Sequence, residues 1–67
     1  MTAAQFEQLD APEVEDVLRW RFDQLVKAGF AAGDAAVLAS HVEVDLHRAA
    51  ALLHRGCPQQ IALRILL

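Results

Sequence analysis

Histidine and cysteine side chains offer the most direct routes to metal binding or nucleophilic attack in this sequence. Two of the three histidines, His47 and His54, are seven positions apart, about 10 Å along a helix, whereas helical histidines that share one ion usually lie four apart. Cys57 precedes Pro58 at an expected helix start, where backbone N–H groups and the helix dipole favour a thiolate. No recognisable set of histidine and acid accompanies this thiol. We therefore expect solvated histidines, His41 included, a cysteine that fills a tight helix corner, and no metal ion or cofactor.

Sequence motifs of common enzyme classes are missing. There is no glycine-rich phosphate loop, no Gly-x-Ser-x-Gly and no His-Glu-x-x-His. Glu13, Glu15 and Asp16 cluster in the first turn of an expected helix, where they complement the helix dipole without any catalytic role. A helical chain of 67 residues also leaves little room for a pocket of a few hundred Å³. The sequence therefore indicates a non-enzymatic protein.

Charge and cysteine content narrow the choice of partner and compartment. Six basic and nine acidic residues give a net charge of −3, whereas a sequence-independent nucleic-acid binder needs a basic face. The same balance gives no reason to expect an anionic membrane surface as partner. No apolar run approaches the roughly 18 residues that span a bilayer, and no basic, apolar signal segment opens the chain. One cysteine cannot form an internal disulfide, so we expect a reducing, cytoplasmic setting.

A long helix is expected to follow residues 1–10, which we interpret as an N-terminal lead-in. Asp10 is a good N-cap, Pro12 suits the first turn, and Glu13 has the spacing of a capping box. Gly29 ends the pattern, because glycine adopts the left-handed conformation at a helix C-terminus at little cost. Between these ends, apolar residues recur every three or four positions and predict one buried face. These residues are Val14, Val17, Leu18, Phe22, Leu25 and Val26.

Three shorter helices are expected after Gly29. The first covers about residues 33–40 and is interrupted by "SHVEV", because β-branched valines are poorer helix formers. The next begins after an Asp45 N-cap and stops at Gly56, and the last begins with Pro58 in its first turn. The expected inward residues of these last two helices are Leu46, Ala49, Ala50 and Leu53, then Ile61, Ala62, Ile65 and Leu66.

These elements predict an all-α fold. Residues 11–56 are expected to form a compact three-helix bundle, with a fourth, C-terminal helix in residues 57–67 that packs on the bundle or projects from it. The chain ends on three apolar residues, which must either fold back onto the first helix or dock elsewhere. We expect them to dock within the monomer or a dimer, since a chain this short needs the buried area.

The glycine–phenylalanine turn and the apolar positions after it resemble the ubiquitin-associated (UBA) domain. The positions that carry the resemblance are Gly29, Phe30, Ala35, Leu46, Ala49, Leu52 and Leu53. The resemblance covers about residues 17–54. It implies a helix, a Met-Gly-Phe-like loop, a short helix and a third helix with an apolar tail. It also implies a partner-binding surface made of Ala28, Gly29 and Phe30 together with Leu53 and His54. Alanine stands here for the family's usual methionine, and His54 for a common apolar residue, which reduces the apolar contact that ubiquitin recognition uses.

Three large side chains leave alternatives open. Phe30 could pack between the first and third helices or be offered to a partner. Arg21 falls near the middle of the apolar face of the first helix, where it must snorkel, pair with a carboxylate or meet something outside the monomer. Trp20 falls to the side of that face. Because Trp and Arg are enriched at interface hot spots, Trp20 and Arg21 are also candidate partner contacts.

The leading functional hypothesis is a protein-interaction or adaptor module that presents an apolar patch to a protein partner and self-associates as a homodimer or other homo-oligomer. The alternative is a small transcriptional regulator in which residues 33–53 form a helix-turn-helix, with His47, Arg48 and Ala51 on the outer face. Against that alternative, the second helix offers few base-reading side chains and the net charge is negative.

Overall fold

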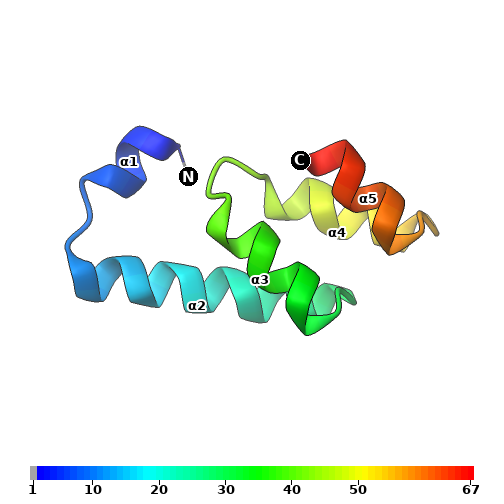
Figure 1. Ribbon diagram of the computed structural model, residues 1–67, viewed down its shortest axis with the longest axis horizontal. Helices are drawn as coiled ribbons and strands as arrows, with labels where there is room; N and C mark the ends of the chain where they lie inside the picture. Colours follow the sequence, from blue (N-terminus) through cyan, green and yellow to red (C-terminus); the bar gives the residue numbers. More distant parts are fainter. Residues whose placement is uncertain (1) are drawn as a thin grey trace.

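The longest helix, α2 (Ala11–Ala28), forms the spine of the molecule in a computed structural model that describes residues 2–67 (Figure 1). It begins where expected, because the Asp10 carboxylate accepts a hydrogen bond from the Glu13 N–H at 3.0 Å. It ends at Gly29, whose φ of 117° is left-handed. The next residue then donates its N–H back to the Leu25 carbonyl at 3.1 Å, which satisfies a helix-end acceptor and turns the chain.

The three helices that follow are α3 (Ala32–Ser40), α4 (Leu46–His54) and α5 (Gln59–Leu66). The Asp45 carboxylate caps α4 by accepting from the backbone N–H groups of His47 and Arg48. Gly56 adopts a positive φ of 87° after α4, as expected of a stop. Pro58 occupies the N-cap of α5, one residue earlier than its expected place in the first turn. The described chain is therefore all-α, with element boundaries close to the predicted ones.

A fifth helix, α1 (Ala3–Glu7), lies within the segment that we expected to be a lead-in. Thr2 and Gln5 form a reciprocal capping box, each side chain bonding the other's backbone N–H. None of its residues is fully buried, so the helix depends on local capping more than on packing. Five residues are too few to show an apolar period, which is why the sequence pattern does not reveal it.

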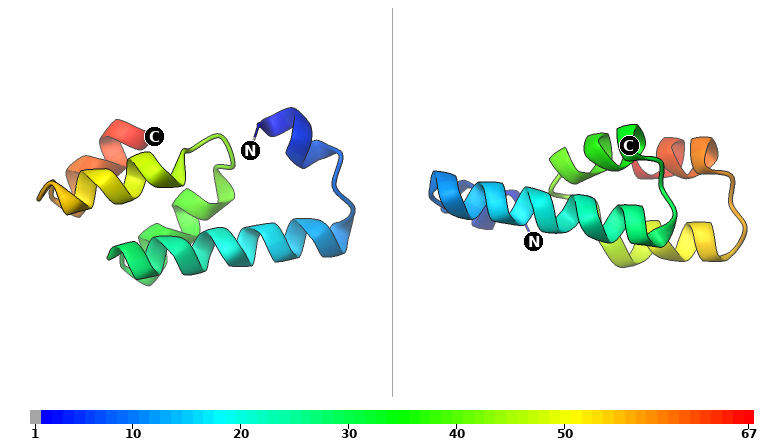
Figure 2. Two further views of the ribbon diagram at one scale, coloured as in Figure 1. Left: turned by 180° about the vertical axis from the view of Figure 1, so that it is seen from behind. Right: turned by 90° about the horizontal axis from the view of Figure 1, so that it is seen from below.

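The core lies where α2, α3, α4 and α5 meet. Ala35, Ala49 and Ala62 are each 0% exposed, and such small side chains let the helix backbones approach closely. Leu25 and Leu38 are the largest side chains that are fully buried, and each contributes about 1.5–3 kcal/mol through burial. Seen from below, with α2 running across the view, α3 and α5 lie toward one side of α2 and α4 toward the other (Figure 2, right). The buried cluster consists of Leu25, Phe30, Ala35, Leu38, Ala39, Val44, Ala49 and Ala62.

The C-terminal helix docks within the monomer, but with a different face from the one predicted. Ala62 is fully buried, and Leu63 and Leu66 pack against the core cluster. The expected inward residues Ile61 and Ile65 are instead 44% and 45% exposed, because the helix is rotated so that its smallest residue meets α4. Val26 on α2 is similarly exposed rather than buried, since it is turned about 100° around that helix from the buried Leu25.

The molecule is elongated, with extents of 36 × 19 × 16 Å. The N-terminal half of α2 reaches beyond the other long helices, and α1 folds back beside it (Figure 1). Among the helices of residues 2–67, none combines the length and apolar character needed to cross a membrane.

Candidate protein-interaction groove

Arg21 is the buried charged residue at the centre of the candidate site. Its side chain is only 4% exposed, and its guanidinium reaches the end of α3 and the loop that follows. Nε donates to the Ala39 carbonyl at 3.1 Å, and Nη2 donates to the carbonyls of His41 at 2.9 Å and Val44 at 3.0 Å, with a longer contact of 3.4 Å to Leu38. The carbonyls at a helix C-terminus lack intrahelical partners, so the arginine supplies the donors that they need.

This arrangement differs from the three fates expected for Arg21. The side chain neither snorkels to solvent nor forms an ion pair, but binds backbone carbonyls inside the monomer. Burial lowers the pKa of Arg21, and the nearby Glu43 carboxylate opposes that effect by favouring the charged form. The guanidinium donates here from two nitrogens held in a fixed plane, whereas a lysine would offer all its donors from a single nitrogen. Arg21 is thus inaccessible as a direct surface contact.

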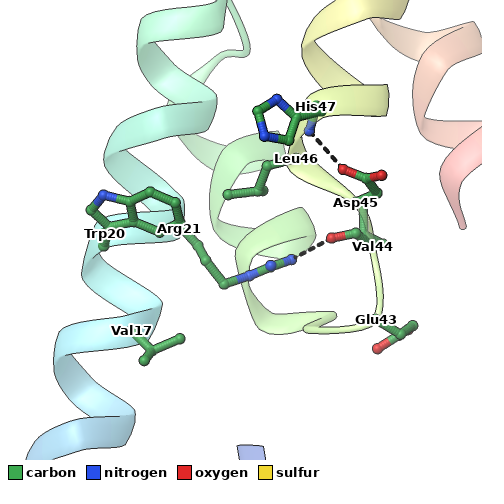
Figure 3. Close-up of a pocket in the computed structure, with 8 residues that line it drawn as sticks. All are labelled: Val17, Trp20, Arg21, Glu43, Val44, Asp45, Leu46 and His47. Carbon is green, nitrogen blue, oxygen red and sulfur yellow. Dashed lines mark hydrogen bonds between the residues drawn. The ribbon is translucent and has the colours of Figure 1, made fainter. Parts of the chain in front are cut away.

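Arg21 holds the loop of residues 41–45 against α2, and a groove opens between them. Figure 3 shows the guanidinium extending from α2 to the Val44 carbonyl, with Leu46 and His47 across from Trp20. The cavity measures about 480 Å³, so the expectation that so short a helical chain leaves little room for a pocket of this size was wrong. Its lining residues are Val17, Trp20, Arg21, Glu43, Val44, Asp45, Leu46 and His47.

The groove continues along the seam between α2 and α4 as a second hollow of about 200 Å³. Trp20, Leu46 and His47 line both hollows, and Gln24 and Ala50 extend the second. We call the two together the Trp20 groove. Trp20 stands at its edge with 58% of its side chain exposed, the highest exposure among the large apolar residues described. A large aromatic ring beside a hollow with apolar walls is typical of protein-contact surfaces.

The loop side of the groove is acidic. Glu43 and Asp45 stand on the loop side, and both are exposed. Counted at about 100° per residue around the α2 axis, Asp16 and Asp23 lie within about 60° of Trp20 but on the side away from Val17 and Gln24, which line the groove. The carboxylates that line the groove are therefore those of Glu43 and Asp45, and the Arg21 cation lies in the groove wall with its donors occupied.

The surface that the UBA resemblance implies is assembled only in part. Gly29 and Leu53 do lie together, since a Cβ added to Gly29 would sit 3.5 Å from the Leu53 Cδ1 atom. Phe30, however, is 3% exposed in the core cluster, so the first of its two alternatives holds. Ala28 and Leu53 are half-buried, and His54 is exposed. With the phenylalanine turned inward, this loop offers a partner little apolar area.

The start of α5 also occupies space beside that loop. The Gln59 Oε1 atom accepts a hydrogen bond from the Ala31 N–H at 2.7 Å, and its Nε2 atom donates to the Asp34 carboxylate. Ala31 is the N-cap of α3, and its methyl side chain cannot accept a hydrogen bond from the first N–H groups of the helix. Gln59 supplies an acceptor for one N–H group at this helix end. The contact ties α5 to α3 and closes the bundle.

The histidines and the cysteine do not assemble into a metal site. Within residues 2–67, no group of three or more His, Cys, Asp or Glu side chains lies close enough to hold an ion. The Nδ1 atom of His41 lies 2.8 Å from the Val37 carbonyl, and Cys57 is half-buried with its Sγ atom 3.6 Å from the Pro58 carbonyl. Of the three histidines, His47 is the one that reaches the Trp20 groove.

Sequence reasoning named Trp20 and Arg21 but not the loop residues that face them. The signal in the sequence was an arginine in the middle of an apolar helix face, because a buried guanidinium needs hydrogen-bond acceptors. The interrupting segment "SHVEV" supplies those acceptors through its backbone, which carries no side-chain signature. The opposite wall of the groove, from Glu43 to His47, could therefore be located only in three dimensions.

Comparisons with known proteins identify no relative. No family model, no curated protein and no solved structure matches this chain. The function of the groove has to be inferred from its own residues.

Proposed function

We propose that this chain is a non-enzymatic protein-interaction module that binds a protein partner through the Trp20 groove. The observation that carries the proposal is the 58% exposure of Trp20 at the edge of a cavity of about 480 Å³ whose lining includes Val17 and Leu46. Tryptophan is the residue type most often found at interface hot spots, and a partner side chain seated beside it would be largely desolvated.

The UBA-like character of the fold is part of this proposal. The order of a long helix, a Gly-Phe turn, a short helix and a third helix supports it. The resemblance implied contacts at the turn, around Ala28 and Phe30, whereas the burial of Phe30 favours a different surface. In our proposal the partner contacts are therefore Trp20 and its neighbours on the α2–α4 seam, with Leu53 and His54 at its far end.

Self-association is a second part of the proposal, and we assign it to the outer face of α5. Ile61 and Ile65 are adjacent on that face and nearly half exposed, and Leu67 is 57% exposed. Two copies that met through the Trp20 groove would instead bring like charges together, since the loop side of the groove is acidic. The single cysteine supports a reducing compartment such as the cytoplasm for the module.

Co-purification from the native source tests the proposal. Three tagged baits should be compared, namely the unmodified chain, Trp20→Ala and Val37→Ala. Val37 is 44% exposed on α3 and does not line the groove, so it is a matched apolar truncation. We expect a partner that is retained by the unmodified and Val37→Ala baits and lost with Trp20→Ala. Equal retention by all three baits would contradict the assignment of the binding surface.

A further inference from the structure

We propose that the segment which occupies the Trp20 groove is cationic and amphipathic, with an apolar side chain in the cavity and Lys or Arg side chains against Trp20 on one side and Glu43 on the other. This inference rests on the proposed function and adds the chemical class of the partner. It follows from the shape of the groove, the charges at its edges and the position of the indole ring.

The shape of the groove suits an inserted apolar side chain. Its volume of about 480 Å³ falls within the range of about 300–1,000 Å³ that is common for binding pockets. Val17, Trp20 and Leu46 supply apolar walls on two different helices, α2 and α4. The hollow beside Gln24 and Ala50 prolongs the groove, so a helical segment could place further apolar residues one turn apart along it.

The charges at the edges favour a cationic occupant. Two carboxylates, those of Glu43 and Asp45, line the groove on its loop side. The Asp45 carboxylate is engaged as the α4 N-cap, whereas Glu43 has no such role in the contacts observed. Lys27, the one lysine of the chain, lies about 10 Å beyond Trp20 in helical rise and does not line the groove. A basic segment would therefore be attracted to this face, and an acidic one repelled.

The exposed indole ring adds a second reason for a cation. A Lys or Arg side chain over the face of a tryptophan is attracted by the negative face of the ring, and the attraction grows when the pair is shielded from water. Trp20 is exposed on one side and lines the groove on the other, so a bound segment would cover the ring. Glu43 lies across the groove from Trp20, on the loop side (Figure 3), so a second cation of the segment would meet this carboxylate.

A second copy of this chain fits the groove less well. Each copy carries a net charge of −3, which opposes association through an acidic face. The exposed apolar face of α5 presents a single cation, Arg64, between Ile61 and Ile65. A segment with several Lys or Arg residues complements the groove better, and such a segment must come from another protein.

The test uses the fluorescence of Trp20, which is the only tryptophan in the chain. The probes are three short peptides that lack Trp and Tyr. The first combines Leu at i, i+3, i+4 and i+7 with Lys elsewhere, the second replaces each Lys by Glu, and the third replaces each Leu by Gln. We expect a saturable blue shift of Trp20 emission with the Leu/Lys peptide alone. Binding of the Leu/Glu peptide with equal affinity, or a failure of all three to bind, would overturn the inference.

Matched charge reversals separate contact at the groove from general attraction. Glu43→Lys should weaken binding of the Leu/Lys peptide by roughly 3- to 10-fold, whereas Glu15→Lys, about 140° from Trp20 around α2, should weaken it by less than about 2-fold. Equal weakening by both variants would show that only net charge matters, which contradicts a specific groove. Trp20 emission that shifts with protein concentration alone would identify a second copy as the occupant.

Failure of this inference can be distinguished from failure of the proposed function. If co-purification shows a partner whose retention requires Trp20 while the Leu/Lys peptide fails to bind, the groove is an interface for a partner of another chemical class. If neither binding is observed, both the proposed function and the class of partner are wrong.

Discussion

Arg21 on α2 donates a hydrogen bond of 3.0 Å to the backbone carbonyl of Val44, a residue 23 positions later in the chain. The same guanidinium nitrogen bonds the His41 carbonyl, so one side chain fixes both ends of the connection between α3 and α4. This connection is also one wall of the Trp20 groove. The residue that stabilises the bundle therefore also shapes the proposed binding surface.

Removal of the Arg21 guanidinium should destabilise the protein strongly. Arg21→Ala leaves the buried carbonyls of Ala39 and Val44 without a donor, so we expect the free energy of unfolding to fall by about 3–5 kcal/mol. A domain of this length has a total stability of only about 3–10 kcal/mol, so this variant could unfold completely. Arg21→Lys keeps one donor group and should lose about 1–3 kcal/mol. Urea denaturation measures both losses.

Arg19→Ala is the matched control for these variants. Arg19 lies on the same helix, but its side chain is exposed. We expect a change within about 0.5 kcal/mol, as for most exposed surface positions. A loss at Arg19 as large as the loss for Arg21→Lys would show that arginine contributes through helix propensity or charge rather than through the carbonyl contacts.

Gly29→Ala should cost about 1–2 kcal/mol because of its backbone conformation. A φ of 117° disfavours any residue with a Cβ atom, although the added atom would make an ordinary contact of 3.5 Å with Leu53. Gly33→Ala, within α3, provides the comparison, since its added Cβ atom meets nothing within 4 Å. That variant should be neutral or up to about 1 kcal/mol more stable. The melting temperature should therefore fall for Gly29→Ala and stay the same or rise for Gly33→Ala.

Deletion of residues 58–67 should lower the melting temperature sharply. The deletion removes the fully buried Ala62, the packed Leu63 and Leu66, and the Gln59 hydrogen bonds that tie α5 to α3. Ile65→Gln is the control, because Ile65 is 45% exposed and should affect self-association more than folding. A truncated chain that melts at the same temperature as the full chain would contradict the docking of α5.

The sequence pattern predicts much of the fold because the helix ends carry explicit signals. Asp10 and Asp45 cap the starts of α2 and α4, and Gly29 adopts the left-handed conformation that ends α2. The face of α5 that packs on the core was predicted less well. Ile61 and Ile65 are more hydrophobic than Ala62, and yet the alanine is buried, because only a small residue fits at that close helix contact.

The candidate site could be predicted only in part from the sequence. Trp20 and Arg21 stand out by residue type, but the acceptors for Arg21 are backbone carbonyls, which every residue possesses. The inward position of Phe30 follows from the turn at Gly29, and that turn removes the phenylalanine from the surface on which the UBA resemblance would place it.

The central claim is that the Trp20 groove is the protein-contact surface, and site-specific photo-crosslinking in the native source tests it most directly. A photoreactive amino acid should replace His47, which lies in the groove, and in a second chain Val37, which lies outside it. The account predicts a crosslinked partner from position 47 and none from position 37. Crosslinks that arise from position 37 but not from position 47 would contradict it.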